Sequence, residues 1–371
     1  MVVNKNNNNI ILQEYLGKAI KNIFNLVLKA SFKNPKETAF VLKAALKSKQ
    51  ANKIRLSYEN KSIHIPPFLI ASISSSCNLF CKGCYARANK ICGENLQKTQ
   101  LSCEKWNDVF KEANNIGISF IFLAGGEPFM RSDVLEAAAQ HKELIFPVFT
   151  NGTMFDEKYY NLFDKNRHLI PVISIEGNKA ETDEKRGEGT YDSILNSINI
   201  LNEKGILYGV SVTVSKTNIK SVLDDFFIES LYKKGCSIVF YVEYVPVDHA
   251  SVNIAPDEDD RVYLENRQKL LRDIYKTLLF ISFPGDEKDM GGCLAAGRGF
   301  FHINPNSDAE PCPFSPYSDT NLNNCSLIEA LKSPLFNNIR NTDMLLNEHK
   351  GGCLLFEKEN EIKELSNALN K

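Results

Sequence analysis

Residues 76–85 read Ser-Cys-Asn-Leu-Phe-Cys-Lys-Gly-Cys-Tyr, which places Cys77, Cys81 and Cys84 on one short loop. The apolar run before the loop, residues 68–73, predicts a buried strand that ends just before the first thiol. Three thiolates at this spacing can hold three irons of a cubane iron–sulfur cluster and leave the fourth iron open to a ligand. A closed structural zinc site needs a fourth Cys or His close by, and the next few residues contain none. The loop therefore predicts an iron–sulfur site with one open coordination position.

The composition is that of an ordinary globular protein. The chain has 371 residues, 43% hydrophobic and 24% charged, enough for one large domain with an appendage or for two domains. No apolar run approaches the ~18–20 residues of a membrane span, and the N-terminal residues do not resemble a signal peptide. Ten cysteines without secretory features favour a reducing compartment and metal binding over disulfides, so we expect a cytoplasmic protein.

The first 61 residues are basic, with twelve Lys and Arg against three Glu, although the net charge of the chain is −1. Residues 10–31 and 36–49 predict two helices, and residues 53–65 predict a short hairpin. The first helix has an apolar face beside several lysines, formed by Ile20, Ile23, Phe24, Val27 and Leu28. Such a helix can lie on an anionic membrane surface, bind an acidic partner, or pack on the catalytic domain with its lysines in solvent. We expect no nucleic-acid partner.

Strand and helix patterns alternate from residue 68 to about residue 245. Apolar strand candidates lie at residues 68–73, 118–123, 145–149, 169–175, 206–214 and 237–245. Amphipathic helices are expected between them, near residues 102–115, 132–142, 156–165, 190–203 and 219–233. The alternation predicts an α/β fold with a parallel sheet, either open and doubly wound or curled into a barrel. Ligand sites in such folds lie at the carboxyl ends of the strands.

Several of these strand ends carry residues suited to ligand binding. Gly125-Gly126-Glu127-Pro128 follows the second strand, and paired glycines let a backbone edge approach a ligand closely. Ser174 ends the fourth strand, and Arg186 follows in the next loop. A guanidinium suits a carboxylate ligand because it donates two charge-assisted hydrogen bonds, although Arg186 can also be a surface residue of a charged loop. Thr150-Asn151-Gly152, after the third strand, can be a ligand contact or simply a turn.

The cysteine loop and these motifs resemble the radical S-adenosylmethionine (radical SAM) superfamily, whose hallmark is Cys-x3-Cys-x2-Cys after the first barrel strand. The resemblance implies a partial (β/α)6 TIM-type barrel. It also implies a [4Fe–4S] cluster on the three cysteines of the loop and S-adenosylmethionine (SAM) as a cofactor. The SAM contacts implied are Tyr85, Gly125, Gly126, Glu127, Thr150, Asn151, Ser174, Arg186 and Val245. One departure is Gly83, because the family usually has an aromatic residue before the third cysteine.

A second set of cysteines, Cys293, Cys312 and Cys353, follows a helix expected at residues 257–279, where the strand–helix alternation should have stopped. The turn sequence at residues 304–308 predicts a hairpin before Cys312. This region resembles the auxiliary-cluster domains of SPASM and twitch radical SAM enzymes, and the resemblance implies an auxiliary iron–sulfur cluster on the three cysteines. Phe356 stands where a twitch domain usually has its fourth cysteine. An open iron, Glu357 and Cys325 stay as alternatives for that position.

The resemblance implies an enzyme that reductively cleaves SAM to a 5′-deoxyadenosyl radical and abstracts hydrogen from a substrate. The auxiliary cluster would assist an oxidation or rearrangement, and a flavodoxin or ferredoxin would supply electrons. A small-molecule substrate is favoured over a peptide, with a peptide maturase as the alternative. A zinc-stabilised binding module and an iron–sulfur electron carrier are the alternatives of another class. We expect a helical and hairpin extension at residues 1–66, the partial barrel at 67–250 and the auxiliary-cluster domain at 251–371.

Overall fold

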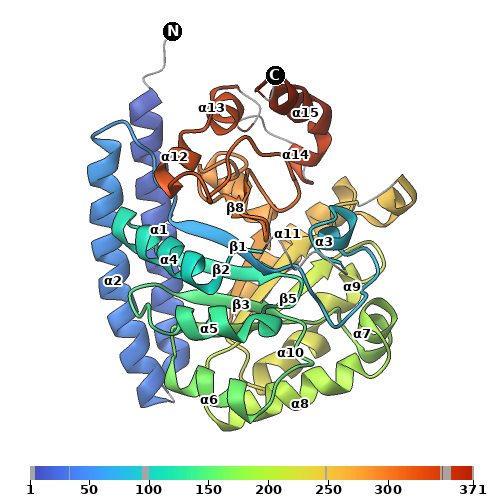
Figure 1. Cartoon of the computed structure of the whole chain (residues 1–371). Coiled ribbons are helices and arrows are strands. Elements are labelled where there is room, and N and C mark those ends of the chain that lie inside the picture. Colours follow the sequence, from blue (N-terminus) through green and yellow to red (C-terminus); the bar gives the residue numbers. More distant parts are fainter. Residues whose placement is uncertain are drawn as a thin grey trace.

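The computed structural model describes residues 5–32, 34–93, 100–246, 249–342, 345 and 352–369. Its sheet runs in the order β7-β6-β5-β4-β3-β2-β1-β8-β9 and does not close on itself (Figure 1). The strands are β1 (Phe68–Ser74), β2 (Phe120–Gly125), β3 (Phe146–Thr150), β4 (Leu169–Ser174), β5 (Gly209–Val214), β6 (Ile238–Glu243), β7 (Leu279–Phe283), β8 (His302–Ile303) and β9 (Ala309–Glu310). Strands β1 to β7 are parallel to their neighbours, which confirms the predicted partial barrel.

Helices α4 to α11 connect the parallel strands, whereas α1 and α2 precede the sheet and α12 to α15 follow it. The longer ones are α1 (Lys5–Ser31), α2 (Pro35–Glu59), α4 (Cys103–Ile116), α6 (Glu157–Lys165), α7 (Lys179–Arg186), α8 (Thr190–Glu203), α10 (Asp225–Lys233), α11 (Glu258–Ile274), α13 (Pro334–Asn341) and α15 (Glu359–Leu369). The shorter ones are α3 (Tyr85–Ala88), η2 (Pro128–Arg131), α5 (Ser132–Ala138), α9 (Ile219–Val222), η3 (His249–Ile254), η4 (Gly285–Met290), α12 (Leu327–Leu331) and α14 (Leu354–Glu357). Buried Trp106 and Phe110 of α4 belong to the core between these helices and the sheet.

Helices α1 and α2 lie side by side along one edge of the molecule (Figure 1). The apolar face of α1 packs against the inner face of the sheet, where Val27 is buried in a cluster with Val172 and Phe240. The ring of Phe24 lies 6.1 Å from that of Phe120. Of the three alternatives for the basic helix, this contact supports packing on the catalytic domain. The apolar face that a membrane would require is already covered by the sheet.

The hairpin expected at residues 53–65 is wrong, because residues 53–59 continue α2. Arg55 explains the difference: its guanidinium is buried and donates to Ser119 Oγ at 3.1 Å and to the carbonyl of Gly117. A side chain that resembled the polar face of a strand is thus the polar anchor between α2 and the loop before β2. No helix among the described residues is long and apolar enough to cross a membrane.

The alternation also continues past residue 245, contrary to expectation. Helix α11 ends at Ile274, and β7 then pairs with β6 in parallel over Leu279–Phe283. The hairpin predicted before Cys312 is confirmed as β8 and β9, an antiparallel pair. Strand β8 also pairs with β1 in parallel, so the C-terminal segment extends the sheet beside the strand that leads into the cysteine loop.

Candidate functional site

The cysteine loop connects β1 to the short helix α3 and is fixed by backbone contacts. The Lys82 N–H donates to the Lys185 carbonyl at 2.9 Å, which ties the loop to α7. Arg87 donates to the Leu79 carbonyl at 2.7 Å, and its guanidinium lies over the ring of Phe80. These contacts hold the three thiols at the carboxyl end of the sheet, as the strand pattern predicts.

A cavity of about 330 Å³ lies at this end of the sheet and joins the two cysteine sets. All six predicted cluster ligands line it: Cys77, Cys81, Cys84, Cys293, Cys312 and Cys353. Of the predicted SAM contacts, all but Glu127 line it too: Tyr85, Gly125, Gly126, Thr150, Asn151, Ser174, Arg186 and Val245. The assignment of these residues as ligands stays a prediction, but segments far apart in the sequence share one cavity.

The described residues contain no group of three or more Cys, His, Asp and Glu arranged to hold a metal ion. This arrangement is compatible with a cubane, which spreads its thiolates over separate irons instead of gathering them around one ion. The donor chemistry fits as well, because thiolates are the usual ligands of iron–sulfur clusters. Asn151 approaches the Cys77 sulfur with its side-chain amide at 3.9 Å, and the Leu79 N–H does so at 3.4 Å. Hydrogen bonds to sulfur tune the potential of such clusters.

The second cysteine set comes from three separate segments. Cys293 follows η4, Cys312 follows β9, and Cys353 is the residue before α14. Burial raises the pKa of all three thiols, that of Cys353 to about 12, with nearby charged groups adding to the increase. Glu287, in η4, interacts electrostatically with each of the three. Metal binding must therefore displace protons from these thiols.

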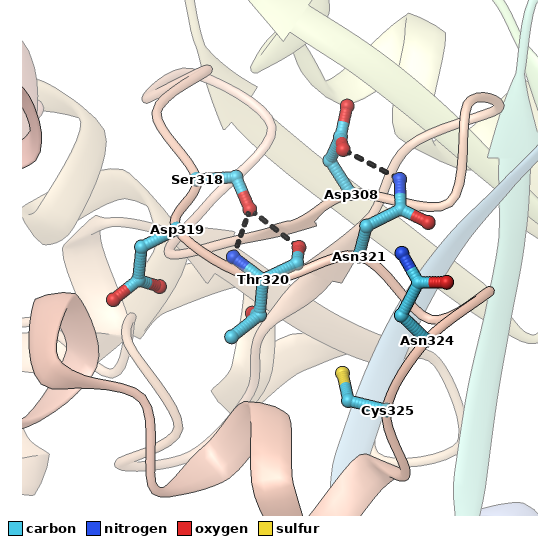
Figure 2. Close-up of a pocket in the computed structure, with 7 residues that line it drawn as sticks. All are labelled: Asp308, Ser318, Asp319, Thr320, Asn321, Asn324 and Cys325. Carbon is cyan, nitrogen blue, oxygen red and sulfur yellow. Dashed lines mark hydrogen bonds between the residues drawn. The ribbon is translucent and has the colours of Figure 1, made fainter. Parts of the chain in front are cut away.

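Two of the residues considered as the fourth ligand of the auxiliary cluster do not line this cavity. Cys325 lines a separate pocket with Asp308, Ser318 and Asn321, shown in Figure 2. Glu357 is exposed and is not among the residues that line the cavity with the three thiols. The geometry thus disfavours recruitment of either residue.

The two glycines of Gly125-Gly126 allow β2 to approach the cysteine loop. A Cβ at Gly125 would lie 2.5 Å from the Ser74 carbonyl oxygen, and one at Gly126 would lie 2.1 Å from that of Ser76. The Gly126 N–H donates to the Ser74 carbonyl at 2.7 Å. Any larger residue would separate β2 from the loop, so these glycines shape the cavity wall whether or not they contact a ligand.

Glu127 lies beneath the cavity wall and is 1% exposed. Its carboxylate accepts hydrogen bonds from the Phe129 N–H (3.1 Å), the Thr150 hydroxyl (2.8 Å) and the Asn151 N–H (2.8 Å). Burial raises its pKa to about 7, and the three hydrogen bonds limit the increase. Glu127 therefore joins the ends of β2 and β3 and positions Thr150 and Asn151, which do line the cavity.

Arg186 faces the cavity and is oriented by Glu176, which is 1% exposed. Its Nε donates to Glu176 Oε1 at 3.0 Å, while Lys185 Nζ donates to Glu176 Oε2 at 3.1 Å. Two cations share one carboxylate, so this wall carries a net positive charge. Such a wall attracts a carboxylate ligand.

Gly83 leaves room for an aromatic ring from another element. A Cβ at Gly83 would lie 2.9 Å from the ring and from the hydroxyl of Tyr244, which follows β6. Tyr244 lines the cavity, is 6% exposed, and its hydroxyl has no hydrogen-bond partner among the described residues. The aromatic side chain that the loop lacks is thus replaced by one at the end of β6.

A buried hydrogen-bonded chain links β1 to the β8–β9 hairpin. Ser72 Oγ lies 2.8 Å from His302 Nε2, and His302 Nδ1 lies 2.7 Å from Glu310 Oε2. Asn304 donates to the other Glu310 oxygen at 2.6 Å. This chain fixes the hairpin that leads to Cys312. The rings of Tyr85 and Phe314 meet edge to face at 5.2 Å and join the two cysteine segments directly.

Sequence reasoning missed Glu176, Lys185, Tyr244 and Glu287 as site residues. Glu176 lies two residues after Ser174, and Lys185 immediately precedes Arg186, so both are close in sequence to predicted contacts. Tyr244 precedes the predicted contact Val245. Glu287 has no motif around it and became recognisable only when β7 placed η4 at the mouth of the barrel.

Comparisons with known proteins agree with this architecture. The fold resembles that of SuiB of Streptococcus suis bound to S-adenosylmethionine, with a TM-score of 0.64 and 17% identity over 79% of this chain and 72% of SuiB. At that identity the likeness shows the fold alone, a partial barrel with a C-terminal extension.

The family follows from the sequence comparison. Residues 71–225 match the Radical SAM superfamily model, so this part of the chain carries a radical SAM domain, and the comparisons support an enzyme of this type with a C-terminal auxiliary domain. Its relatives include Fe-coproporphyrin III synthase of Methanosarcina barkeri, 30% identical over 42% of this chain and 39% of the relative. Mycofactocin maturase MftC of Mycolicibacterium smegmatis is 24% identical over 69% of this chain and 66% of the relative. The chain thus spans about two fifths of the length of the first and two thirds of the second. The family implies a [4Fe–4S] cluster and SAM as cofactors, and SPASM-type relatives imply auxiliary clusters.

Proposed function

We propose that the protein reductively cleaves SAM and abstracts hydrogen from a substrate, with a [4Fe–4S] cluster on Cys77, Cys81 and Cys84 and an auxiliary cluster on Cys293, Cys312 and Cys353. The observation that carries the proposal is the cavity that all six cysteines and eight predicted SAM contacts line together. The first cluster, when bound with one open iron, supplies the electron that cleaves the sulfonium of SAM. A flavodoxin or ferredoxin is the proposed reductant.

The residues of the cavity wall have separate tasks in this proposal. Arg186, held by Glu176, binds the carboxylate of SAM. Thr150 and Asn151, held by Glu127, form the adjacent wall, and Ser174 offers a hydroxyl beside them. Tyr244 and Val245 provide the apolar surface for adenine, with the Tyr244 hydroxyl available to a base nitrogen. The protein thus orients SAM and excludes water from the site.

We favour a small-molecule substrate with a large apolar part. Phenylalanines form the inner end of the cavity, and their rings contact one another: Phe68 with Phe122 at 5.9 Å and Phe149 with Phe240 at 5.3 Å. Fe-coproporphyrin III synthase, similar over 42% of this chain, makes a tetrapyrrole the first candidate. The mycofactocin maturase, similar over 69% of this chain, favours a ribosomally made peptide as the second candidate. The proposed outcome is an oxidation or rearrangement assisted by the auxiliary cluster.

The iron content of the reconstituted protein tests whether it holds two clusters. Anaerobic reconstitution should give about eight irons per chain, and about four after Cys77→Ala/Cys81→Ala/Cys84→Ala or after Cys293→Ala/Cys312→Ala/Cys353→Ala. Cys236→Ala is the matched control, because Cys236 is buried in a strand–helix core outside the cavity and should leave the iron content unchanged. A parent protein with about four irons that only the first triple variant removes would eliminate the auxiliary cluster. Stoichiometric zinc instead of iron would eliminate both.

A further inference from the structure

We propose that Glu287 is the fourth ligand of the auxiliary iron–sulfur cluster, a role that rests on the proposed function of Cys293, Cys312 and Cys353. Glu287 lines the same cavity as these three cysteines. It lies in η4, the first element after β7, so its carboxylate is placed at the carboxyl end of the last parallel strand. The set becomes three thiolates and one carboxylate drawn from three separate segments, with Glu287 and Cys293 on the same one.

Glu287 places a carboxyl group in a buried position beside the thiols. Glu287 is 5% exposed, and no Lys, Arg or His among the described residues forms an ion pair with it. Its side chain interacts with the Cys293 thiol and with the Leu294 N–H, and Arg298 is the nearby cation, but that guanidinium donates to the Cys293 carbonyl. A buried carboxylate without an ion pair is costly, and coordination to the open iron of a cluster on the adjacent thiols would stabilise it.

The position of Glu287 relative to the thiols supports the same assignment. The Glu287 side chain is within hydrogen-bonding reach of the Cys293 thiol, and Cys312 and Cys353 line the same cavity. By contrast, Cys325 lies in the pocket of Figure 2, and Glu357 is exposed. Among the described residues, Glu243 and Glu287 are the buried carboxylates that line this cavity, and Glu243 is already paired with Arg261.

The backbone around Glu287 holds it in place. The Glu287 N–H donates to the Pro284 carbonyl at 2.8 Å, and the Gly292 N–H donates back to the Glu287 carbonyl at 3.1 Å. The second bond ties the glutamate to the residue before Cys293. A ligand held this firmly needs little reorganisation to bind iron, which distinguishes it from a flexible surface carboxylate.

The test isolates the auxiliary cluster in the Cys77→Ala/Cys81→Ala/Cys84→Ala protein, loaded anaerobically with ⁵⁷Fe and sulfide. Iron content, EPR and Mössbauer spectra are then measured for this protein and for added Glu287→Ala, Glu287→Cys and Glu357→Ala changes. We expect about four irons per chain with one iron site distinct from the rest, because oxygen replaces sulfur there. Glu287→Ala should lose that iron on mild oxidation and leave about three, with the EPR signal of a three-iron cluster. Glu287→Cys should keep four without the distinct site, and Glu357→Ala should match its parent.

Three other outcomes would contradict the proposal. If Glu287→Ala retains four irons and an unchanged Mössbauer spectrum, or if the parent shows no distinct iron site, Glu287 is not a ligand although the auxiliary cluster exists. If the parent protein binds no iron while the wild-type chain binds about four, the auxiliary cluster of the proposed function fails, and the inference fails with it. If Glu287→Ala does not fold, as judged by circular dichroism, the Glu287→Cys spectrum decides: an unchanged distinct site overturns the proposal.

Discussion

Glu127 connects the ligand-facing ends of two strands through a single carboxylate. Its pKa is raised by burial to about 7, so the folded protein disfavours the ionised form more than the unfolded chain does. The contribution of Glu127 to the free energy of unfolding is therefore fully present below its unfolded-state pKa, near 4.5. It is lost as the pH rises through about 7.

Glu127→Gln, which cannot ionise, should reveal that dependence. The unfolding free energy of the parent apoprotein should fall relative to the variant by about 3 kcal/mol between pH 4.5 and 8. Denaturant titrations of both proteins across that range measure the difference. A constant difference at all pH values would mean that folding does not shift the pKa of this carboxyl.

Substitution of Tyr244 tests the proposed contact with adenine. Tyr244→Ala should weaken SAM binding to the reconstituted protein about tenfold, because a base loses its stacking partner. Isothermal titration calorimetry gives the Kd, and Tyr263→Ala, an exposed residue of α11, is the matched control. Equal affinities for parent, variant and control would place the adenine elsewhere.

The β8–β9 hairpin is the element that brings Cys312 to the cavity, and its buried hydrogen-bonded chain holds it against β1. His302→Leu should destabilise the protein by on the order of 3 kcal/mol, since it removes the bond to Ser72 and the ion-pair partner of the buried Glu310 carboxylate, which then keeps only its hydrogen bond from Asn304. The His302→Leu/Glu310→Leu double variant should cost less than the sum of the single changes. Denaturant unfolding of the four apoproteins completes this cycle, and strict additivity would show that the pair is not coupled.

At the level of elements, the sequence predicted six of the seven parallel strands and the C-terminal hairpin. It failed at β7, because the apolar stripe of α11 runs almost into the apolar run at residues 278–283, and the two together resemble one long helix. It also failed at residues 53–59, where Arg55 is polar but buried. Local periodicity cannot identify a charged side chain whose partners, Gly117 and Ser119, lie some 60 residues away.

Over the whole molecule, the cysteine loop and its family were recognisable because Cys-x3-Cys-x2-Cys is a local pattern. The shared cavity was not, since it joins the ends of β1 to β7 with segments around residues 293, 312 and 353. For the same reason Glu287 was missed and Glu357 and Cys325 were considered, because sequence proximity to a cysteine says little about distance in the fold. The role of α1 against the inner face of the sheet also depended on long-range packing.

The central claim is that the Cys77, Cys81 and Cys84 site cleaves SAM, and the most direct measurement is the formation of 5′-deoxyadenosine. Anaerobically reconstituted protein, mixed with SAM and dithionite, should release 5′-deoxyadenosine and methionine, and Cys81→Ala should release neither. Chromatography with mass detection quantifies both products. Protein that carries its full iron complement, binds SAM and still forms no 5′-deoxyadenosine under reductant would contradict the account.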